Sequence, residues 1–173
     1  MKQTFVIGID GSNADAAAKG IMFYAEWLEL KCDELASKLA EKGRDIAMQV
    51  MAGHVYSGGS IGSLHVESLG SGRYAIKAAS EAILFLEFGT GIKGGGHPEP
   101  NGYGPGTYPG QKHALDPRGW WFPTNDERLI VRTDKNGQGW GHSYGNAPAR
   151  PFYRAVTELE QDLDAIVREV FEN

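Results

Sequence analysis

The residues with the clearest chemical use form a glycine-rich run. Positions 89–94, GTGIKG, have the spacing G-x-G-x-x-G with which dinucleotide-binding folds hold a pyrophosphate. Such a site needs a strand before the run and a helix that begins at its last glycine. Here the triple glycine 94–96 and two nearby prolines disfavour the start of a helix. We therefore interpret the run as a loop and expect no nucleotide cofactor.

Histidine and cysteine offer two further kinds of site, a metal centre and a nucleophile. No two histidines have the i, i+4 spacing of a helical metal site. The following three could still converge, with Glu99 or Asp116 as a further ligand: His97, His113 and His142. We favour solvated histidines and predict no metal ion. Cys32 falls on an apolar helical stripe, where we expect a packed thiol and not a nucleophile. Because no set of residues combines a nucleophile, a base and an oxyanion site, the chain is predicted not to be an enzyme.

One carboxylate lies in an apolar segment, where it needs a partner. Glu87 belongs to the run ILFLEF, residues 83–88, and burying its charge is costly unless it is paired. Arg150 is the best partner by chemistry, because a planar guanidinium can hold a carboxylate through two hydrogen bonds. The pair could close the central segment onto the last helix of the same chain, or it could join two subunits.

Aromatic residues gather in the last third of the chain. A small sheet could hold five of them, Trp120, Trp121, Phe122, Trp140 and Tyr144. We interpret them as core packing of that sheet, and a platform for a sugar ring is the alternative.

Composition bounds the class of protein. The chain has 173 residues and a net charge of -5, so we expect a single domain over residues 1–173 and no general nucleic-acid binder. One cysteine suits a reducing compartment. The apolar stretch near the N-terminus is too short for a signal peptide or a membrane span, so a soluble protein made in the cytoplasm is expected.

Periodicity predicts the elements of the first half. Alternation predicts a strand over Thr4–Asp10, and an apolar stripe predicts a helix from Ala14 to about Met51, with Gly20 and Gly43 as weak points. So long a stripe exceeds what one small domain can bury, and part of it is expected to face another subunit. Residues 63–69 and 73–79 read as a hairpin around a Gly-Ser-Gly turn.

The second half is predicted to combine a long insert with a small sheet and a final helix. A short helix should end at Gly89, and residues 89–119, with ten glycines and five prolines, form a flexible insert loop. Strand-like runs at 120–122, 129–133 and 138–144 predict a β-meander, with an Asn-Gly turn before the last. An amphipathic helix follows from Pro151. The fold class is therefore α+β, with a central antiparallel sheet flanked by the first and last helices.

Several of these segments resemble the small neck proteins of long-tailed bacteriophages, which are head–tail joining or tail-completion proteins and are also called minor tail components. The likeness covers essentially the whole chain in order. It is carried by Tyr74-Ala75, the run LEFGTG at 86–91, His97-Pro98, the run GWWFP at 119–123 and the run ARPF at 149–152.

The resemblance implies a structural virion protein without catalysis, made in the host cytoplasm and located in the neck or tail. It implies a homo-oligomeric ring, expected to have six subunits, that contacts neighbouring neck and tail proteins, lets DNA pass as cargo and involves no membrane. We assign assembly to Glu87, Phe88, Gly89, Thr90, Arg150, Pro151 and Phe152. We assign docking to His97, Pro98, Tyr103, Tyr108, Trp120 and Trp121. The alternative is a metal- or glycan-binding module, or an enzyme, built on the insert at 89–144.

Overall fold

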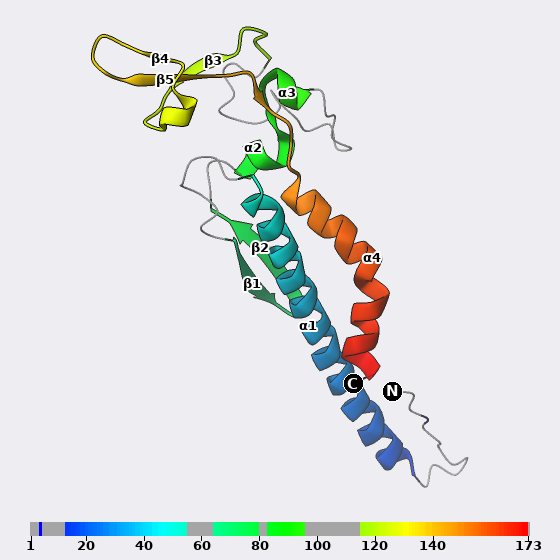
Figure 1. The fold of residues 1–173 in the computed structure, drawn as a ribbon. Helices are drawn as coiled ribbons and strands as arrows, with labels where there is room; N and C mark the ends of the chain where they lie inside the picture. Colours follow the sequence, from blue (N-terminus) through cyan, green and yellow to red (C-terminus); the bar gives the residue numbers. More distant parts are fainter. Residues whose placement is uncertain (1–3, 5–12, 55–63, 80–82, 96–114, 173) are drawn as a thin grey trace. The chain divides into compact units, whose positions relative to one another are not determined.

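The fold is seen in a computed structural model of the chain, which describes residues 4, 13–54, 64–79, 83–95 and 115–172 (Figure 1). It is of the predicted α+β class, with long first and last helices and antiparallel strands. The chain divides into two compact units. Unit 1 comprises Met1–Asp45, His65–Lys77 and Val156–Asn173, and unit 2 comprises Ile46–Leu64 and Ala78–Ala155. The strand predicted over Thr4–Asp10 lies outside the described residues, apart from Thr4.

The first helix, α1, runs without interruption over Ala14–Ala52 and confirms the prediction. Its sequence is rich in Ala, Leu, Glu and Lys, the residues that lose least on entering a helix. The N–H of Ala17 donates to the carbonyl of Asn13 at 3.0 Å and begins the ladder. Neither Gly20 nor Gly43 breaks the helix.

Unit 1 contains the predicted hairpin, formed by β1 (Leu64–Gly70) and β2 (Arg73–Ala78). Its two-residue turn has positive φ at both positions, 52° at Ser71 and 67° at Gly72. A type I′ turn requires this, and its twist matches that of the flanking strands. The hydroxyl of Tyr74 on β2 donates to the carboxylate of Asp33 on α1 at 2.9 Å, which ties the hairpin to the helix.

Helix α4 (Pro151–Glu172) packs antiparallel along α1 within unit 1 (Figure 1). The ion pair of Lys42 with Asp162 spans 2.7 Å. Gly43 explains the close approach, because a Cβ there would lie 3.0 Å from Leu159 of α4 and 3.1 Å from Ile76 of β2. A glycine that the sequence marks as a weak point of the helix is therefore a packing position.

Unit 2 holds α2 (Ile83–Phe88), α3 (Gly91–Gly95) and the strands that follow the insert. These are β3 (Trp120–Pro123), β4 (Arg132–Thr133), β5 (Gly139–Ser143) and β6 (Gly145–Asn146), with the 3-10 helix η1 (Glu127–Leu129) between β3 and β4. The β4–β5 hairpin around the Asn-Gly turn is confirmed, with Arg132 opposite Trp140. The strand order is β3-β5-β4, however, so the three strands are not a meander.

Two further expectations fail. Residues 89–119 were expected to form a loop, yet α3 forms one turn over Gly91–Gly95. Its start is supported by tertiary pairing rather than by propensity, since Gly91 bridges Gly145. Cys32 is exposed instead of packed, because the α1 stripe on which it lies is only partly covered.

The first half of α1 carries large apolar side chains that solvent reaches. Those that are exposed are Ile21, Met22, Phe23, Leu28 and Leu30, with Leu30 at 72% and Phe23 at 66%. At 3.6 residues per turn, Ile21 and Leu28 share one side of the helix and Phe23 and Leu30 share the other, so apolar side chains are exposed on more than one side. Among the described helices, none combines the length and the apolar character that crossing a membrane requires.

Candidate functional site

The buried carboxylate of Glu87 binds the N-terminus of the last helix. Helix α2 places Glu87 against the first turn of α4. The N–H of Phe152 donates to Oε2 at 2.9 Å, and the N–H of Tyr153 donates to Oε1 at 3.0 Å. The first N–H groups of a helix have no intrahelical acceptor and carry partial positive charge. A carboxylate from another element therefore caps α4 and has its own charge compensated.

The residue before the helix needs this external cap. Arg150 occupies the N-cap position with φ at 60°, and its carbonyl accepts the N–H of Arg154 at 2.9 Å. An N-cap residue with a short polar side chain would normally supply the acceptor. Pro151, at the first helical position, has no N–H to satisfy. The two N–H groups that remain in the first turn are those bound by Glu87.

A backbone contact holds the same two segments together. The carbonyl of Leu86 accepts the N–H of Ala149 at 2.8 Å and the N–H of Arg150 at 3.2 Å. The residue before the carboxylate is thus bound to the two residues that precede α4. The segment LEFGTG and the segment ARPF, far apart in the sequence, form one site in unit 2.

The glycines of the LEFGTG segment serve this packing. Gly89 ends α2 with φ at 76°, and its N–H donates to the carbonyl of Phe85 at 3.0 Å. A Cβ on Gly89 would come within 2.8 Å of the carbonyl oxygen of Asn146. Thr90 is buried, and its Oγ1 accepts the N–H of Asn146 at 3.0 Å.

This geometry accounts for the G-x-G-x-x-G spacing without a nucleotide. A helix, α2, precedes the run where a dinucleotide fold has a strand, and the five-residue α3 overlaps the run instead of beginning at its last glycine. The space next to Gly91 is already filled, since a Cβ there would lie 2.5 Å from the carbonyl oxygen of Tyr144. The run approaches its own backbone closely instead of a phosphate.

The structure brings most of the predicted assembly residues together. Glu87 binds the N–H of Phe152, and the carbonyl of Leu86 binds the N–H of Arg150, which precedes Pro151. Thr90 pairs with Asn146, four residues before Arg150. Arg150 is half-buried, and its guanidinium carbon lies 5.8 Å from the ring centroid of Tyr153. The ion pair predicted between Glu87 and Arg150 stays a prediction, as does its location within or between subunits.

The predicted docking residues divide between described and undescribed parts. His97, Pro98, Tyr103 and Tyr108 lie outside the described residues, whereas Trp120 and Trp121 begin β3. Within the described ranges, no group of three His, Cys, Asp or Glu side chains could hold a metal ion. Two of the three histidines proposed as ligands, His97 and His113, are not among those residues.

Strand alternation sorts the aromatic residues onto two faces of the three-stranded sheet. Trp120 and Phe122 face one side, where Gly141 leaves room for the Phe122 ring, as core packing predicts. The opposite side we call the aromatic face. It consists of Trp121, Pro123, Arg132, Trp140 and His142, to which Tyr144 is joined by a ring contact. Trp121 is 42% exposed and Tyr144 is 46% exposed, so for these two the core interpretation is wrong.

Side chains on the aromatic face touch one another in a row. The guanidinium carbon of Arg132 lies 4.0 Å from the centroid of the Trp121 ring. The ring of His142 is 4.5 Å from that of Trp121 and 4.8 Å from that of Tyr144, both edge to face. A cation on an indole face is attracted by the ring electrons, which keeps the guanidinium in place.

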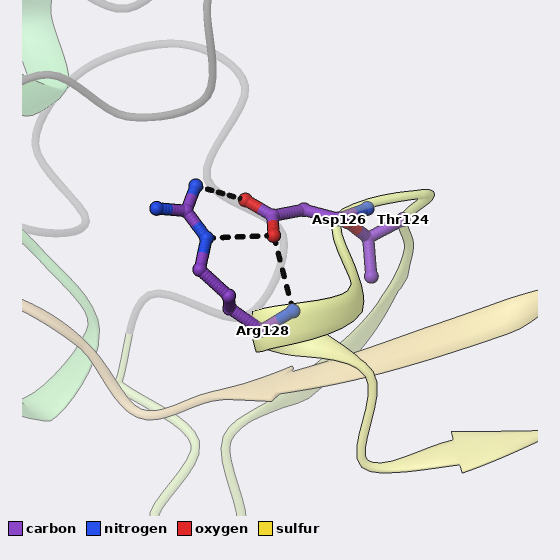
Figure 2. Close-up of polar contacts among 3 residues, drawn as sticks. All are labelled: Thr124, Asp126 and Arg128. Carbon is purple, nitrogen blue, oxygen red and sulfur yellow. Dashed lines mark hydrogen bonds and ion pairs between the residues drawn. The ribbon is translucent and has the colours of Figure 1, made fainter.

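Acidic side chains shape the loops at the edge of this sheet. The pKa of Asp134 lies below its usual range because the N–H groups of Gln138 and Asn136 donate to its carboxylate, helped by the indole N–H of Trp140. Asp126 caps η1 by accepting the N–H of Arg128 at 3.1 Å and its guanidinium at 2.6 Å (Figure 2). The guanidinium hydrogen bond lowers the pKa of Asp126.

The residues whose backbone pairs with the LEFGTG segment were not predicted from the sequence. Gly145 and Asn146 pair with Gly91 and Thr90, and Leu86 contributes only its carbonyl. Backbone partners leave no mark in the type of a side chain. The one available signal was Gly145, since a glycine next to the end of a strand often marks a close approach of two backbones.

Comparison of the chain with known proteins finds no matching family model, no matching curated protein and no matching solved structure. The site is therefore defined by its geometry alone.

Proposed function

We propose that this protein is a structural component of the neck of a long-tailed bacteriophage, where it joins head to tail as an oligomeric ring through which DNA passes. One observation carries the proposal. The segments LEFGTG and ARPF, which carry the resemblance to neck proteins, are joined by the Glu87 carboxylate and the Leu86 carbonyl. Two motifs that together carry a resemblance are expected to form one site, and in this chain the two lie in contact.

The exposed part of α1 supports a role in assembly. Its five large apolar side chains between residues 21 and 30 are accessible to solvent, although a monomer gains stability by covering such residues. A ring of identical subunits would cover the same surface on every copy.

The charge balance supports passage rather than capture of DNA. Unit 2 contains seven acidic and eight basic residues, and unit 1 contains fifteen acidic and nine basic residues. The acidic excess therefore lies in unit 1. A lumen lined by a strong basic excess would hold the duplex through its phosphates.

Imaging of the purified protein by negative-stain electron microscopy tests this proposal. We expect rings with a central hole wide enough for duplex DNA, and we expect those rings to cap isolated tail tubes. Monomers that ignore tail tubes at every concentration would overturn it.

Elemental analysis of the same preparation tests the alternative of a metal-binding module on the insert. The neck proposal expects no stoichiometric metal. One zinc ion per chain that persists after dialysis would favour the alternative.

A further inference from the structure

The aromatic face offers an exposed positive charge, Arg132, which lies on the ring of Trp121 and is also attracted by the nearby carboxylate of Asp134. Arg132 is exposed and takes part in none of the ion pairs found within the described ranges. Its guanidinium carbon lies 4.0 Å from the centroid of the Trp121 ring, and the side chain is exposed, so its N–H donors are accessible to a partner. A guanidinium that is already positioned loses less freedom when it binds a carboxylate. The exposed ring of Trp121 lies beside it, and the exposed ring of Tyr144 follows in the same row beyond His142.

A groove in unit 1 has the opposite character. We call it the acidic groove. It is lined by Glu26, Glu29, Leu30, Cys32 and Asp33 of α1 and by Ser71 and Gly72 of the hairpin turn. Three carboxylates thus surround an exposed leucine, and Met22 extends the apolar surface along the same side of the helix.

Two of those carboxylates are available to a partner. Glu26 and Glu29 are exposed and form none of the ion pairs seen in the described part of the chain. Asp33 already accepts the hydroxyl of Tyr74 and is held in position by it. The groove therefore presents negative charge around an apolar centre.

We propose that the aromatic face of one copy binds the acidic groove of a second copy. This contact rests on the proposed function, since it would be the joint between neighbouring subunits of the ring. Arg132 meets the carboxylates of Glu26 and Glu29, while Trp121 and Tyr144 cover Leu30. Charge complementarity selects this occupant, because the face and the groove carry opposite charges and each places them around apolar side chains.

The contact joins two different surfaces, so each copy uses one of each. Such head-to-tail association closes into a ring when the rotation between copies allows it. Exposed ion pairs alone contribute little, and burial of the aromatic and aliphatic side chains supplies the affinity. The charges set which surfaces meet and in which orientation.

Charge reversal in separate chains tests the contact. The face variant carries Arg132→Glu, and the groove variant carries Glu26→Lys with Glu29→Lys. Each alone places like charges opposite each other in every contact, and we expect its association constant to fall about tenfold or more. Mixed in equal amounts, the two variants can alternate with complementary charges at every contact, and association should return. Sedimentation velocity over a range of protein concentrations measures both effects.

Matched variants separate the contact from general effects of charge and folding. Arg154→Glu, and separately Glu158→Lys with Glu160→Lys, make the same changes at exposed positions of α4 and should associate as the unaltered chain does. Because Arg132→Glu also removes the stacking on Trp121, Arg132→Gln serves as a milder variant. Thermal melts followed by circular dichroism verify that all variants fold. Trp121→Ala should weaken association without changing its response to salt.

The outcomes separate this contact from the proposed function. Association that is weakened in each variant and restored when the two are mixed supports the contact. Rings that form unchanged in both variants would overturn it and leave the neck proposal standing, whereas a monomer at all concentrations would overturn both. A glycan array tests the alternative of a sugar site. If the unaltered chain binds a glycan, and Trp121→Ala loses that binding but still self-associates, the aromatic face binds a sugar and the contact is overturned.

Discussion

Glu87 performs a structural task that the type of the residue alone does not reveal. Its two oxygens accept the N–H groups of Phe152 and Tyr153. These hydrogen bonds offset the desolvation of the buried carboxylate, and they also cap the N-terminus of α4. A neutral cap would satisfy the same groups with weaker bonds, because bonds to a charged acceptor are roughly twice as strong.

Replacing Glu87 by Gln should lower the free energy of unfolding by about 2 kcal/mol. The amide keeps the size of the side chain but turns one acceptor into a donor that faces an N–H. Urea denaturation followed by circular dichroism measures the change. Glu158→Gln, on an exposed position of α4, is the matched control and should stay within about 0.5 kcal/mol of the unaltered chain. Equal midpoints for the two variants would contradict the capping role.

The predicted pairing of Glu87 with the guanidinium of Arg150 calls for a double-mutant cycle. We expect Glu87→Gln and Arg150→Met to be non-additive by at least about 0.5 kcal/mol in the free energy of unfolding, because the two charges share one partly buried site. The same urea titrations provide the four values. Strict additivity would show that Arg150 acts at this site through its backbone only.

Acidification should loosen the turn that Asp134 holds. Its pKa is lowered in the folded state by the donors that surround it, so the unfolded chain binds the proton more readily. The stabilisation is therefore present above the ordinary aspartate pKa of about 3.9 and is lost as pH falls through the lower folded value. The indole N–H resonance of Trp140 should titrate with a midpoint below about 3.9. Asp134→Asn should abolish that titration, and a midpoint above the ordinary value would contradict the assignment.

At the scale of elements, glycines decide where strands and helices come together. Gly43 lets α4 and β2 approach α1, and Gly145 lets β6 reach the residues between α2 and α3. Both are positions where the backbone itself is the surface that packs. Their substitution is expected to change the contact between elements more than the elements themselves.

Gly145→Ala should be far more harmful than Gly137→Ala. Both glycines have positive φ, 95° and 84°, which costs a side chain about 1–2 kcal/mol. At Gly145 a Cβ would also collide with the carbonyl of Thr90, whereas nothing lies within 4 Å at Gly137. We expect the free energy of unfolding to fall by about 3 kcal/mol or more at Gly145 and by about 1 kcal/mol at Gly137.

Thermal melts of the two alanine variants measure this difference. Gly137 is the control because it shares the backbone strain without the collision. Equal losses of stability would show that β6 does not approach Thr90 as described.

At the scale of the whole molecule, charge is divided unevenly along the chain. Unit 1 carries six more acidic than basic residues, and unit 2 carries one more basic than acidic residue. Copies of such a chain can attract one another through unlike units although the net charge is -5.

Self-association should therefore weaken as salt is added. Ions at about 0.5 M screen exposed charges over a much shorter distance than ions at about 0.05 M. We expect sedimentation velocity to show a lower association constant at the higher salt concentration, and a smaller dependence on salt for Arg132→Gln. Association that strengthens with salt would indicate an apolar contact without a charge contribution.

The sequence by itself determined the elements whose signals are local. The stripe of α1, the Gly-Ser-Gly turn of the hairpin and Pro151 at the start of α4 act within a few residues, and the structure confirms each of them. The need for a partner at Glu87 was equally readable, because a charge among apolar residues is costly wherever the chain folds.

Only the tertiary structure decided which groups meet. Two partners of Glu87 are backbone N–H groups, which every residue except proline carries, so no residue type could identify these two. The order β3-β5-β4, the outward side of Trp121 and the exposure of Cys32 likewise depend on which surfaces other segments cover. Local sequence patterns determine the secondary structure of a segment, whereas its tertiary contacts depend on residues that are distant in the sequence.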